Sequence, residues 1–426
     1  MGDHGAHGGS SPTRVLHNRN FARLFSAGAA SIGGFSLGQV ALNWLVYSET
    51  GSTANVAYLA LASIVATIVL SIFAGTLVDR QNRRLIMILS DFSRAASLAV
   101  LAIALFLAGF NLSLVIAVSF ALGAFSTLFY PAERALLPML ISKDEVADAN
   151  GLIMVTNSVF QAVASGAGGA LVAILGATLA LGLNSATFLA SGLLILSIAT
   201  AGSLWRAPEN DGAKQRSFMS DVAEGIRYLV GWKGLLYLTL SSGFLNFFFA
   251  MISTYVVVYV AQVLHGGAFV FGALVALLTL GFGPGAILVG RTKAVSRAGM
   301  VWGAMSLGTG IAILALAFAP DEYFAFGVAF ATGIILGYGN TTWLTLVQLI
   351  IPSEMQGRYF GVDQLGSFAA IPLGQIVGAL LIPAVGVQFE FAVGALGLLA
   401  TSAFFFYSKE MRSLRYIEPT RVLNGV

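Results

Sequence analysis

The sequence predicts an all-α membrane protein, and its composition and apolar runs lead to that prediction. Of the 426 residues, 57% are hydrophobic and only 10% are charged, whereas a soluble domain carries about a quarter charged residues. The apolar residues gather in runs of roughly 20, the length that crosses a bilayer core. Because lipid offers no partners for backbone polar groups, such runs must be helices. The 49 glycines fit this class, since small residues let membrane helices approach closely.

Twelve apolar runs can be followed along the chain. They are expected at residues 21–47, 54–78, 85–108, 112–137, 144–174, 177–204, 234–264, 268–290, 298–319, 322–350, 354–383 and 387–408. An even number of spans places both termini on one side. All 22 Lys and Arg residues fall on that side, while the opposite loops hold acidic residues only. Since cytoplasmic loops carry the excess of basic residues, both termini are expected in the cytoplasm.

The longest polar segment, residues 205–233, separates two halves of six spans. Its second part has apolar positions at helical spacing with charges between them, which predicts an amphipathic helix on the cytoplasmic membrane surface. A regulatory domain is the alternative. The expected organisation is a cytoplasmic tail (1–20), a six-helix bundle (21–204), the linker (205–233), a second bundle (234–408) and a cytoplasmic tail (409–426).

The two halves resemble copies of each other. Ser142 is followed by Glu145 at the start of the fifth span, and Ser353 by Gln356 at the start of the eleventh. Each pair has the spacing of a capping box. Equivalent features in two six-span halves indicate an internal repeat, which is a transporter architecture.

A short polar loop between the second and third spans carries the most specific motif. Its sequence, GTLVDRQNRR, begins at Gly75 and has the glycine, aspartate and basic residues of G-x-x-x-D-[RK]-x-G-[RK]-[RK]. Asn82 stands in place of the second glycine, and asparagine tolerates the left-handed conformation expected there. The loop resembles that of the major facilitator superfamily. The segments QVALNWLVYSETGS, YPAERALLP, DVAEGIRYL and IIPSEMQGRYFGV resemble the branch that includes multidrug, macrolide and enterobactin exporters.

The resemblance implies the major facilitator fold, with twelve transmembrane helices in two pseudo-symmetric six-helix bundles and transport by alternating access. In the fifth span Ser165 replaces the proline of the antiporter motif, which weakens the inference of antiport. Gly166, Gly168 and Gly169 remain, and they allow close helix packing. The corresponding loop of the second half, GRTKAVSRAG, lacks the aspartate.

Charges at the cytoplasmic face are expected to form a latch that breaks when this side opens. Asp79 can engage the positive end of the eleventh span together with Arg358, and Glu133 can share the loop arginines. The alternative is that the arginines only anchor the loop in the cytosol. The expected latch residues are Gly75, Asp79, Arg80, Arg83, Arg84, Glu133, Arg134 and Arg358.

Ionisable side chains within a span are usually functional. Asp363 lies about ten residues into the eleventh span, roughly 15 Å along it. Because a carboxyl group in a low dielectric holds its proton more strongly, Asp363 is the first proton-coupling candidate, followed by Glu133 and Asp91. Asp91 is expected to pair with Arg94. Asp363 alternatively pairs with Arg358 or faces cytosolic water.

Uncharged polar residues are the candidates for substrate contact. The resemblance implies that spans one, four, seven and ten line a central cavity. Gln39 and Asn43 share one face of span one, as do Asn157 and Gln161 in span five. The candidates are Gln39, Asn43, Tyr130, Asn157, Gln161, Asn246, Asn340 and Trp343. Amides among 31 phenylalanines suggest a lipophilic or amphipathic ligand, although polar residues also hold membrane helices together.

These features predict a proton-coupled multidrug efflux transporter in the inner or plasma membrane of a prokaryote. A dedicated exporter of one compound, such as a siderophore or lysolipid, is the first alternative. An intramembrane enzyme or receptor is the second, but the chain has no cysteine and no deeply placed histidine for such a site. The expected partners are a small-molecule substrate, protons and the bilayer. No cofactor, metal or nucleic acid is expected, and the chain is expected to be a monomer.

Overall fold

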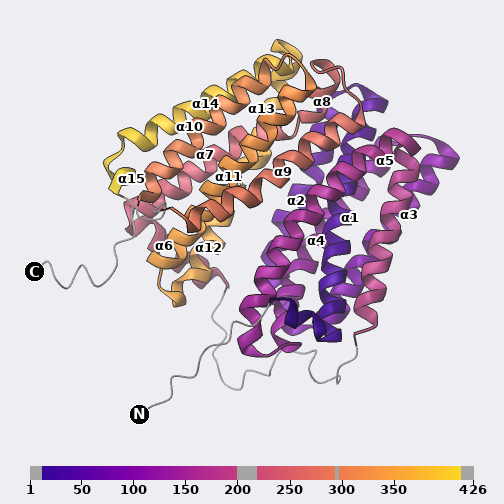
Figure 1. Ribbon diagram of the computed structural model, residues 1–426, viewed down its shortest axis with the longest axis horizontal. Helices are drawn as coiled ribbons and strands as arrows, with labels where there is room; N and C mark the ends of the chain where they lie inside the picture. The colour runs from indigo at the N-terminus through magenta and orange to yellow at the C-terminus, as the bar shows by residue number, and fades with distance from the viewer. Residues whose placement is uncertain (1–11, 199–217, 293–296, 414–426) are drawn as a thin grey trace, which may run out of the picture.

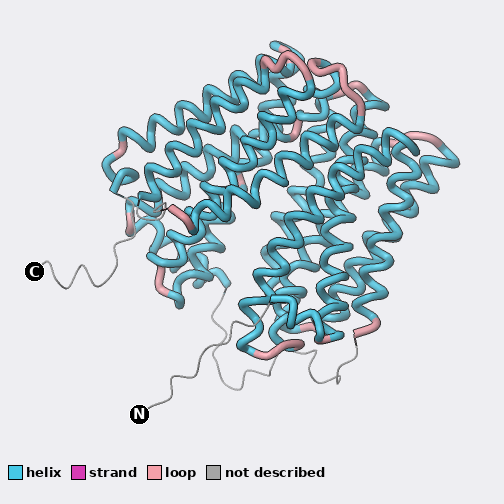
Figure 2. The backbone as a smooth tube through the Cα atoms, viewed as in Figure 1, coloured by secondary structure: helices cyan, strands magenta, loops and turns pink. Residues whose placement is uncertain are grey.

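The computed structural model describes residues 12–198, 218–292 and 297–413, and nearly all of these residues are helical (Figures 1 and 2). Twelve helical segments within this part of the chain are long and apolar enough to cross a membrane. The prediction of twelve membrane-spanning helices is therefore confirmed.

The first bundle holds six spans in five long helices. Its fifth and sixth spans follow each other within α5 (Val146–Leu196), and the chain turns sharply between them at Gly176, where φ is 79°. Only glycine adopts this conformation without strain. The elements are η1 (Pro12–His17), α1 (Arg19–Thr50), α2 (Thr53–Arg80), α3 (Arg83–Ala108), α4 (Leu112–Leu136), η2 (Leu137–Met139), η3 (Lys143–Glu145) and α5 (Val146–Leu196).

Polar residues between the spans cap the helices that follow. Asn18, Ser52 and Asn111 each accept a hydrogen bond from a backbone N–H in the first turn of α1, α2 and α4. Asn82 does the same for α3 and accepts from the Leu85 N–H at 3.1 Å. Its φ is −66°, so the expectation of a left-handed turn at Asn82 is wrong. Asparagine is favoured here because its side chain supplies an N-cap.

The second bundle contains two interrupted spans. Span seven is divided into α7 and α8, and span eleven into α12 and α13, although each was predicted as one helix. Pro372 explains the second break, because it lacks the N–H that would bond to the Phe368 carbonyl and its ring crowds that carbonyl. The elements are α6 (Phe218–Gly231), α7 (Lys233–Ser253), α8 (Val256–Gln262), α9 (Ala268–Gly290), α10 (Ala298–Ala317), α11 (Glu322–Ile350), α12 (Ser353–Phe368), α13 (Ala370–Val385), α14 (Val387–Tyr407) and α15 (Lys409–Ser413).

The two predicted capping boxes have different outcomes. In the first, the Ser142 N–H donates to the Glu145 carboxylate at 3.1 Å, which is the glutamate half of the box. In the second, Pro352 occupies the N-cap position of α12 and offers no side-chain acceptor. Gln356 instead turns back and donates to the Ile351 carbonyl at 3.0 Å. The Ser353 side chain lies outside the described part of the structure, so its role in this box stays a prediction, while Gln356 secures the end of α11.

The two bundles meet along α5 and α9 and along α2 and α13. Between α5 and α9 the backbones touch, since a methyl group added at Gly169 would lie 2.8 Å from the Gly272 Cα atom. A methyl group added at Gly168 would lie 3.2 Å from the backbone of Leu37 in α1. The expectation that the span-five glycines permit close packing is confirmed.

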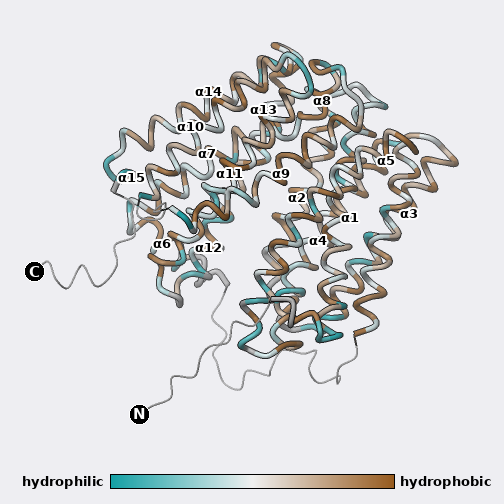
Figure 3. The backbone as a smooth tube through the Cα atoms, viewed as in Figure 1, coloured by the Kyte–Doolittle hydropathy of each residue, from teal (hydrophilic) through white to brown (hydrophobic). Residues whose placement is uncertain are grey.

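The bundles meet at one end of the molecule and diverge toward the other. Gln262 at the end of α8 donates to the Tyr47 hydroxyl of α1 across the bundles at 2.9 Å. We call this the closed end. The other end carries η1, α6, α12 and α15, and we call it the terminal end (Figure 1). Hydrophilic segments gather there in Figure 3.

The helix α6 packs against α12 at the terminal end. The two approach so closely that a methyl group added at Gly225 would lie 2.8 Å from the Arg358 carbonyl oxygen. Leu229 of α6 is buried, while Ile226 is exposed. The segment predicted as an amphipathic helix is thus a helix, and it is docked on the start of span eleven.

Candidate functional site

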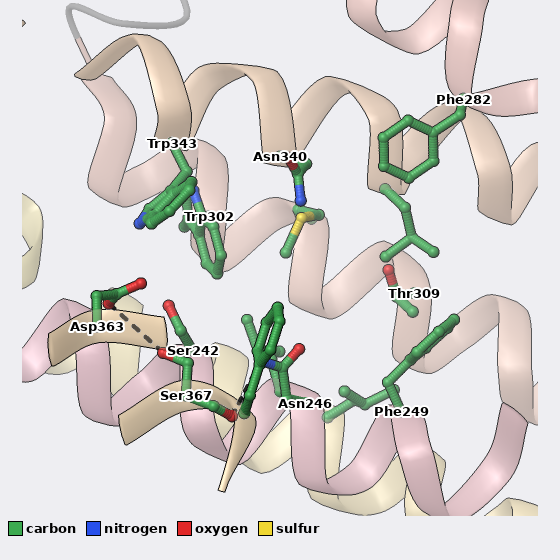
Figure 4. Close-up of a pocket in the computed structure, with 15 residues that line it drawn as sticks. Ser242, Asn246, Phe249, Phe282, Trp302, Thr309, Asn340, Trp343, Asp363 and Ser367 are labelled. Atoms are coloured by element: carbon green, nitrogen blue, oxygen red, sulfur yellow. Dashed lines mark hydrogen bonds between the residues drawn. The ribbon is translucent and has the colours of Figure 1, made fainter. Parts of the chain in front are cut away.

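A cavity of about 240 Å³ lies within the second bundle, between α7, α9, α10, α11, α12 and α14 (Figure 4). Four residues predicted from the sequence are on its wall. Asn246 comes from α7, Asn340 and Trp343 from α11, and Asp363 from α12. The structure therefore brings together residues that are separated by more than 100 positions along the chain.

The rest of this wall is mostly aromatic and aliphatic. Phe249 and Phe282 lie on opposite sides of the space in Figure 4, with Trp302 beside Trp343. The Nε1 atoms of Trp302 and Trp343 and the Thr309 hydroxyl are buried and have no hydrogen-bond partner among the described residues. Buried polar atoms without partners are rare in proteins, so their clustering here marks an unusual site.

Among the described residues that line this cavity, Asp363 is the only acid. Its side chain is buried, and its Oδ1 atom accepts a hydrogen bond from the Thr239 hydroxyl at 2.6 Å. The hydroxyls of Tyr359 and Ser367 lie 3.5 Å from the same oxygen. Figure 4 shows the contact with Ser367 and the second carboxylate oxygen turned toward the tryptophans. Hydroxyl groups, rather than Arg358, thus surround this carboxylate.

The residues that hold Asp363 are not among the site residues predicted from the sequence. Tyr359 and Ser367 are four positions before and after it, so helical spacing could have found them. Thr239 is 124 positions away and has no local pattern that relates it to α12.

A second cavity, of about 470 Å³, lies between the bundles. Gln39 and Asn43 of α1 and Gln161 of α5 line it from the first bundle, as predicted. Thr254, at the break between α7 and α8, and Gln375 of α13 line it from the second. Interrupted helices mark binding sites in many transporters, and here the breaks in spans seven and eleven adjoin the two cavities.

Two of the predicted substrate contacts lie elsewhere. Asn157 is half-buried one turn before Gln161, but it lines neither cavity. Tyr130 lies inside the first bundle, where its ring meets the edge of Phe129 at 5.7 Å between centroids.

A buried group of charges occupies the first bundle. Asp91 and Arg94 form the expected ion pair, and both side chains are 0% exposed. The Ser31 hydroxyl donates to Asp91 at 3.4 Å, and Arg94 donates to the Ser126 hydroxyl at 3.3 Å. The pair is thus embedded in hydroxyls rather than water.

Aromatic rings complete this environment. The Arg94 guanidinium carbon lies 4.7 Å from the centre of the Phe129 ring and 4.5 Å from that of Phe188. Cation–π contacts of this kind strengthen when the site is dry.

Glu133 adds a second buried acid to the same region. A methyl group added at Gly28 would lie 2.1 Å from its Oε1 atom, so the carboxyl group fits only because residue 28 has no side chain. The charged side chains that act on Glu133 are Arg134, Asp91 and Arg94. Arg134 is exposed, so one buried arginine faces two buried acids.

The arginines of the loop motif bind carbonyl groups of their own bundle. Arg83 donates to the Ala135 carbonyl at 3.3 Å, and Arg84 donates to the Ile195 carbonyl at 3.1 Å. Each carbonyl lies in the last turn of its helix, which attracts positive charge. The side chains of Asp79 and Arg80 and the surroundings of Gly75 lie outside the described part of the structure, so their predicted latch roles stay predictions.

Arg358 forms an ion pair with Glu224 of α6, with Nη1 and Oε1 2.8 Å apart. This pair joins the linker helix to the start of span eleven. Among the described residues, no group of three or more His, Cys, Asp or Glu could hold a metal ion.

With these sites in view, comparison with known proteins identifies the family. Residues 10–419 match the major facilitator family model described as transmembrane secretion effector. The chain belongs to this family. Because the family consists of transporters, the prediction of a transporter rather than an enzyme is confirmed.

This major facilitator transporter is similar in sequence to several bacterial proteins. It is 27% identical over 410 residues to the uncharacterized transporter YkuC of Bacillus subtilis, covering 92% of each chain. It is 26% identical over 416 residues to the multidrug efflux pump Tap of Mycolicibacterium fortuitum, covering 92% of this chain and 96% of Tap.

Solved structures share its fold. The nucleoside transporter NupG superposes with a TM-score of 0.72 at 10% identity, covering 91% of this chain and 99% of NupG. A bacterial homologue of the lysosomal transporter Spinster, described as inward-facing and occupied, gives 0.71 at 14% identity and covers 96% of this chain and 100% of that one. The predicted fold of two six-helix bundles is therefore confirmed.

Proposed function

We propose that this transporter exports lipophilic or amphipathic small molecules in exchange for protons, by alternating access. The observation that carries the proposal is Asp363, a buried carboxylate held by hydroxyls on the wall of an aromatic cavity. A group in this position can bind either a proton or a positively charged part of a substrate. Competition for one site is the simplest physical basis for exchange.

The cavity linings support a ligand with a large apolar part. The described residues that line the two cavities include no Lys or Arg, and their polar groups are mainly amides and hydroxyls. Such a surface favours neutral or cationic compounds over anionic ones, because only Asp363 carries charge. The similarity to Tap, which is named a multidrug efflux pump, agrees with this substrate class.

A change in the surroundings of Asp363 determines whether its carboxyl group binds or releases a proton. When substrate and water enter the cavity the carboxyl group ionises more readily, and when the cavity is dry it keeps its proton. Glu133 and Asp91 are the second and third candidates, since one buried arginine cannot neutralise two acids.

Alternating access is supported by the shape of the two bundles. They touch at the closed end through Gly169 and Gly272 and diverge at the terminal end. In the opposite state, Asp79 is proposed to latch the terminal end against the start of α12 and Arg358. Arg83 and Arg84 then support this latch by fixing the loop to its own bundle.

The terminal end is proposed to face the cytoplasm of a prokaryotic cell, because the basic residues gather there. Single cysteines can test this orientation, since the chain has none of its own. Cysteines at Asn111, Ala177 and Asp321 are expected to react with an impermeant thiol reagent from outside. Those at Arg84, Lys214 and Lys409 should react only after permeabilisation, and labelling of one of these from outside would reverse the orientation.

The proposed function is tested by proton movement in proteoliposomes. Purified transporter is reconstituted with an imposed pH gradient, and drugs, siderophores and lysolipids are added in turn. Substrate-dependent proton flux with several unrelated drugs is the expected result. Flux with one siderophore or lysolipid alone would establish a dedicated exporter, and transport without proton flux would exclude proton coupling.

A further inference from the structure

Glu390 is a buried acid that the proposed cycle does not use. It lies in the first turn of α14, at the closed end of the second bundle. Its side chain is 0% exposed, and neither carboxylate oxygen has a hydrogen-bond partner among the described residues. Asp363, by contrast, has three hydroxyl groups around one oxygen.

Two tyrosine hydroxyl groups of the same region are bonded elsewhere. Tyr255, between α7 and α8, lies close enough to interact electrostatically with Glu390. Its hydroxyl, however, donates to the backbone carbonyl of Gln375. Tyr259 of α8 stacks on Phe391, the neighbour of Glu390, at 4.9 Å, but its hydroxyl donates to the Leu316 carbonyl. Neither tyrosine is therefore available to stabilise a charged Glu390.

On the described helices that pack against α14, no cation lies near enough to balance the charge. The helices α10 and α13, which pack on α14, contain no titratable residue. Lys233 and Tyr237 of α7 and Lys409 of α15 are at the terminal end, roughly 30 Å away by helix rise. His265, in the loop after α8, is exposed.

An isolated buried carboxyl group avoids its desolvation cost by taking up a proton. The surroundings of Glu390 therefore suit a neutral carboxyl group better than a charged one. Glu390 is also close to a route to water. Thr254 and Gln375 line the cavity between the bundles, and the buried Tyr255 follows Thr254 directly. The Tyr255 hydroxyl also bonds to the backbone of Gln375, so this tyrosine connects the cavity wall with the surroundings of Glu390.

We infer that Glu390 is a proton-binding site, which keeps its proton while the closed end is shut and exchanges it with water when that end opens. The inference rests on the proposed alternating access. It places a second proton site in the second bundle, at the opposite end from the cavity that contains Asp363.

Infrared difference spectroscopy of the purified protein tests this inference without transport. Glu390→Gln keeps the shape of the side chain but removes the acid. The spectrum of the parent minus this variant should contain the carbonyl band of a protonated carboxyl group at neutral pH. Glu322→Gln, at a partly exposed acid in the first turn of α11 at the same end, should give no such band. Absence of the Glu390 band would overturn the inference.

A disulfide can then fix the closed end. A Cβ atom at Gly166 would lie 3.4 Å from that of Ala276, so cysteines at these positions are close enough to bond across the bundles. In the locked protein the Glu390 band should persist as pH rises, and after reduction it should be lost at lower pH. If the Glu390 band titrates identically in the locked and the reduced protein, opening of the closed end does not control the proton. That result would overturn the inferred exchange.

Two further measurements distinguish a folding defect, or a failure of the proposed transport function, from a failure of the inference about Glu390. Because Glu390→Gln replaces a neutral group by a neutral one, its melting temperature should match that of the parent, and a large fall would indicate a paired, charged Glu390. If no substrate moves protons in liposomes, the proposed function fails. A pH-sensitive Glu390 band in the reduced protein alone would then still support the proton site.

Discussion

At the scale of single residues, the two bundles hold buried charge in two different ways. In the first, Arg94 neutralises Asp91 directly and two aromatic rings cover the guanidinium group. In the second, Asp363 has no cation and depends on hydroxyl donors such as Thr239. The first arrangement is suited to permanent charge, whereas the second can accommodate a carboxyl group with or without its proton.

Replacement of Asp363 tests the proton site. Asp363→Asn keeps the size of the side chain and an oxygen for Thr239 but cannot bind a proton. We expect proton-driven transport to be abolished while downhill exchange of substrate continues, both measured in proteoliposomes. Asp321→Asn is the matched control, because asparagine can still cap α11 through the Phe324 N–H. Gradient-driven transport at the parent rate would transfer the coupling role to Glu133 or Asp91.

Replacement of Arg94 tests the permanent pair. Arg94→Met leaves the Asp91 carboxylate buried without its cation, a change that costs about 3–5 kcal/mol. We expect a clearly lower melting temperature than that of the parent. Tryptophan fluorescence of the protein in detergent measures it. Adding Asp91→Asn removes the unpaired charge and should restore most of the loss. Arg291→Met, at an exposed arginine, is the control, and equal melting temperatures for the Arg94 variant and this control would contradict a structural pair.

The sequence was sufficient to find the acids but not their partners. Asp363 and Asp91 stand out because charged residues within apolar runs are rare. Arg94 is found by its helical spacing from Asp91. Thr239 and Tyr255 become relevant only when α7 packs beside α12 and α14, and no local pattern encodes that packing.

At the scale of helices, the spans were predictable because apolar runs and polar caps mark their limits. The interruptions were not predicted, because each lies inside an apolar run. Pro372 accounts for one of them through its missing N–H. A proline also marks the start of α12, where Pro352 takes the N-cap position at which a serine was expected.

The contact between α5 and α9 supplies a prediction about the closed end. A methyl group at Gly169 would lie 2.5 Å from the Ala268 carbonyl oxygen, and backbone atoms cannot move aside cheaply. Overpacking of this kind costs about 1–3 kcal/mol, so Gly169→Ala should shift the protein roughly tenfold toward opening at this end. The yield of the disulfide between cysteines at Gly166 and Ala276 measures the shift.

Gly151→Ala is the control for this substitution. It adds the same methyl group to the same helix at a position with no atom within 4 Å. Its disulfide yield should equal that of the parent. If Gly169→Ala also leaves the yield unchanged, the close approach of α5 and α9 does not determine the closed state.

At the scale of the whole molecule, the two bundles and their connection were predictable from the repeat and the linker, but the conformation was not. The sequence is the same in every state of a transporter, so it cannot state which end is closed. The structure has a closed end opposite the terminal end, and at the terminal end Arg358 is paired with Glu224 of α6. That pairing bears on the role proposed for Asp79.

The proposed latch requires Arg358 to serve two acids in turn. Arg358 pairs with Glu224 when the two bundles are apart at the terminal end. When the bundles close at this end, Arg358 is expected to engage Asp79. The two acids then compete for one guanidinium group, and substitutions at them should have opposite effects. Asp79→Asn removes a contact worth about 1–2 kcal/mol at a partly buried helix start, so it should favour the open terminal end roughly tenfold.

Glu224→Gln should favour closure by a smaller amount, because an ion pair with partly exposed side chains contributes about 0.2–1 kcal/mol. Spin labels on cysteines at Gln81 and Arg291, exposed residues of opposite bundles, can measure both shifts as distance distributions. Cysteines at Asp79 and Glu354 should cross-link when the terminal end is closed and poorly when it is open. If they never cross-link, or if both acid variants give the parent distances, the latch is excluded, and the loop arginines act only as anchors and helix caps.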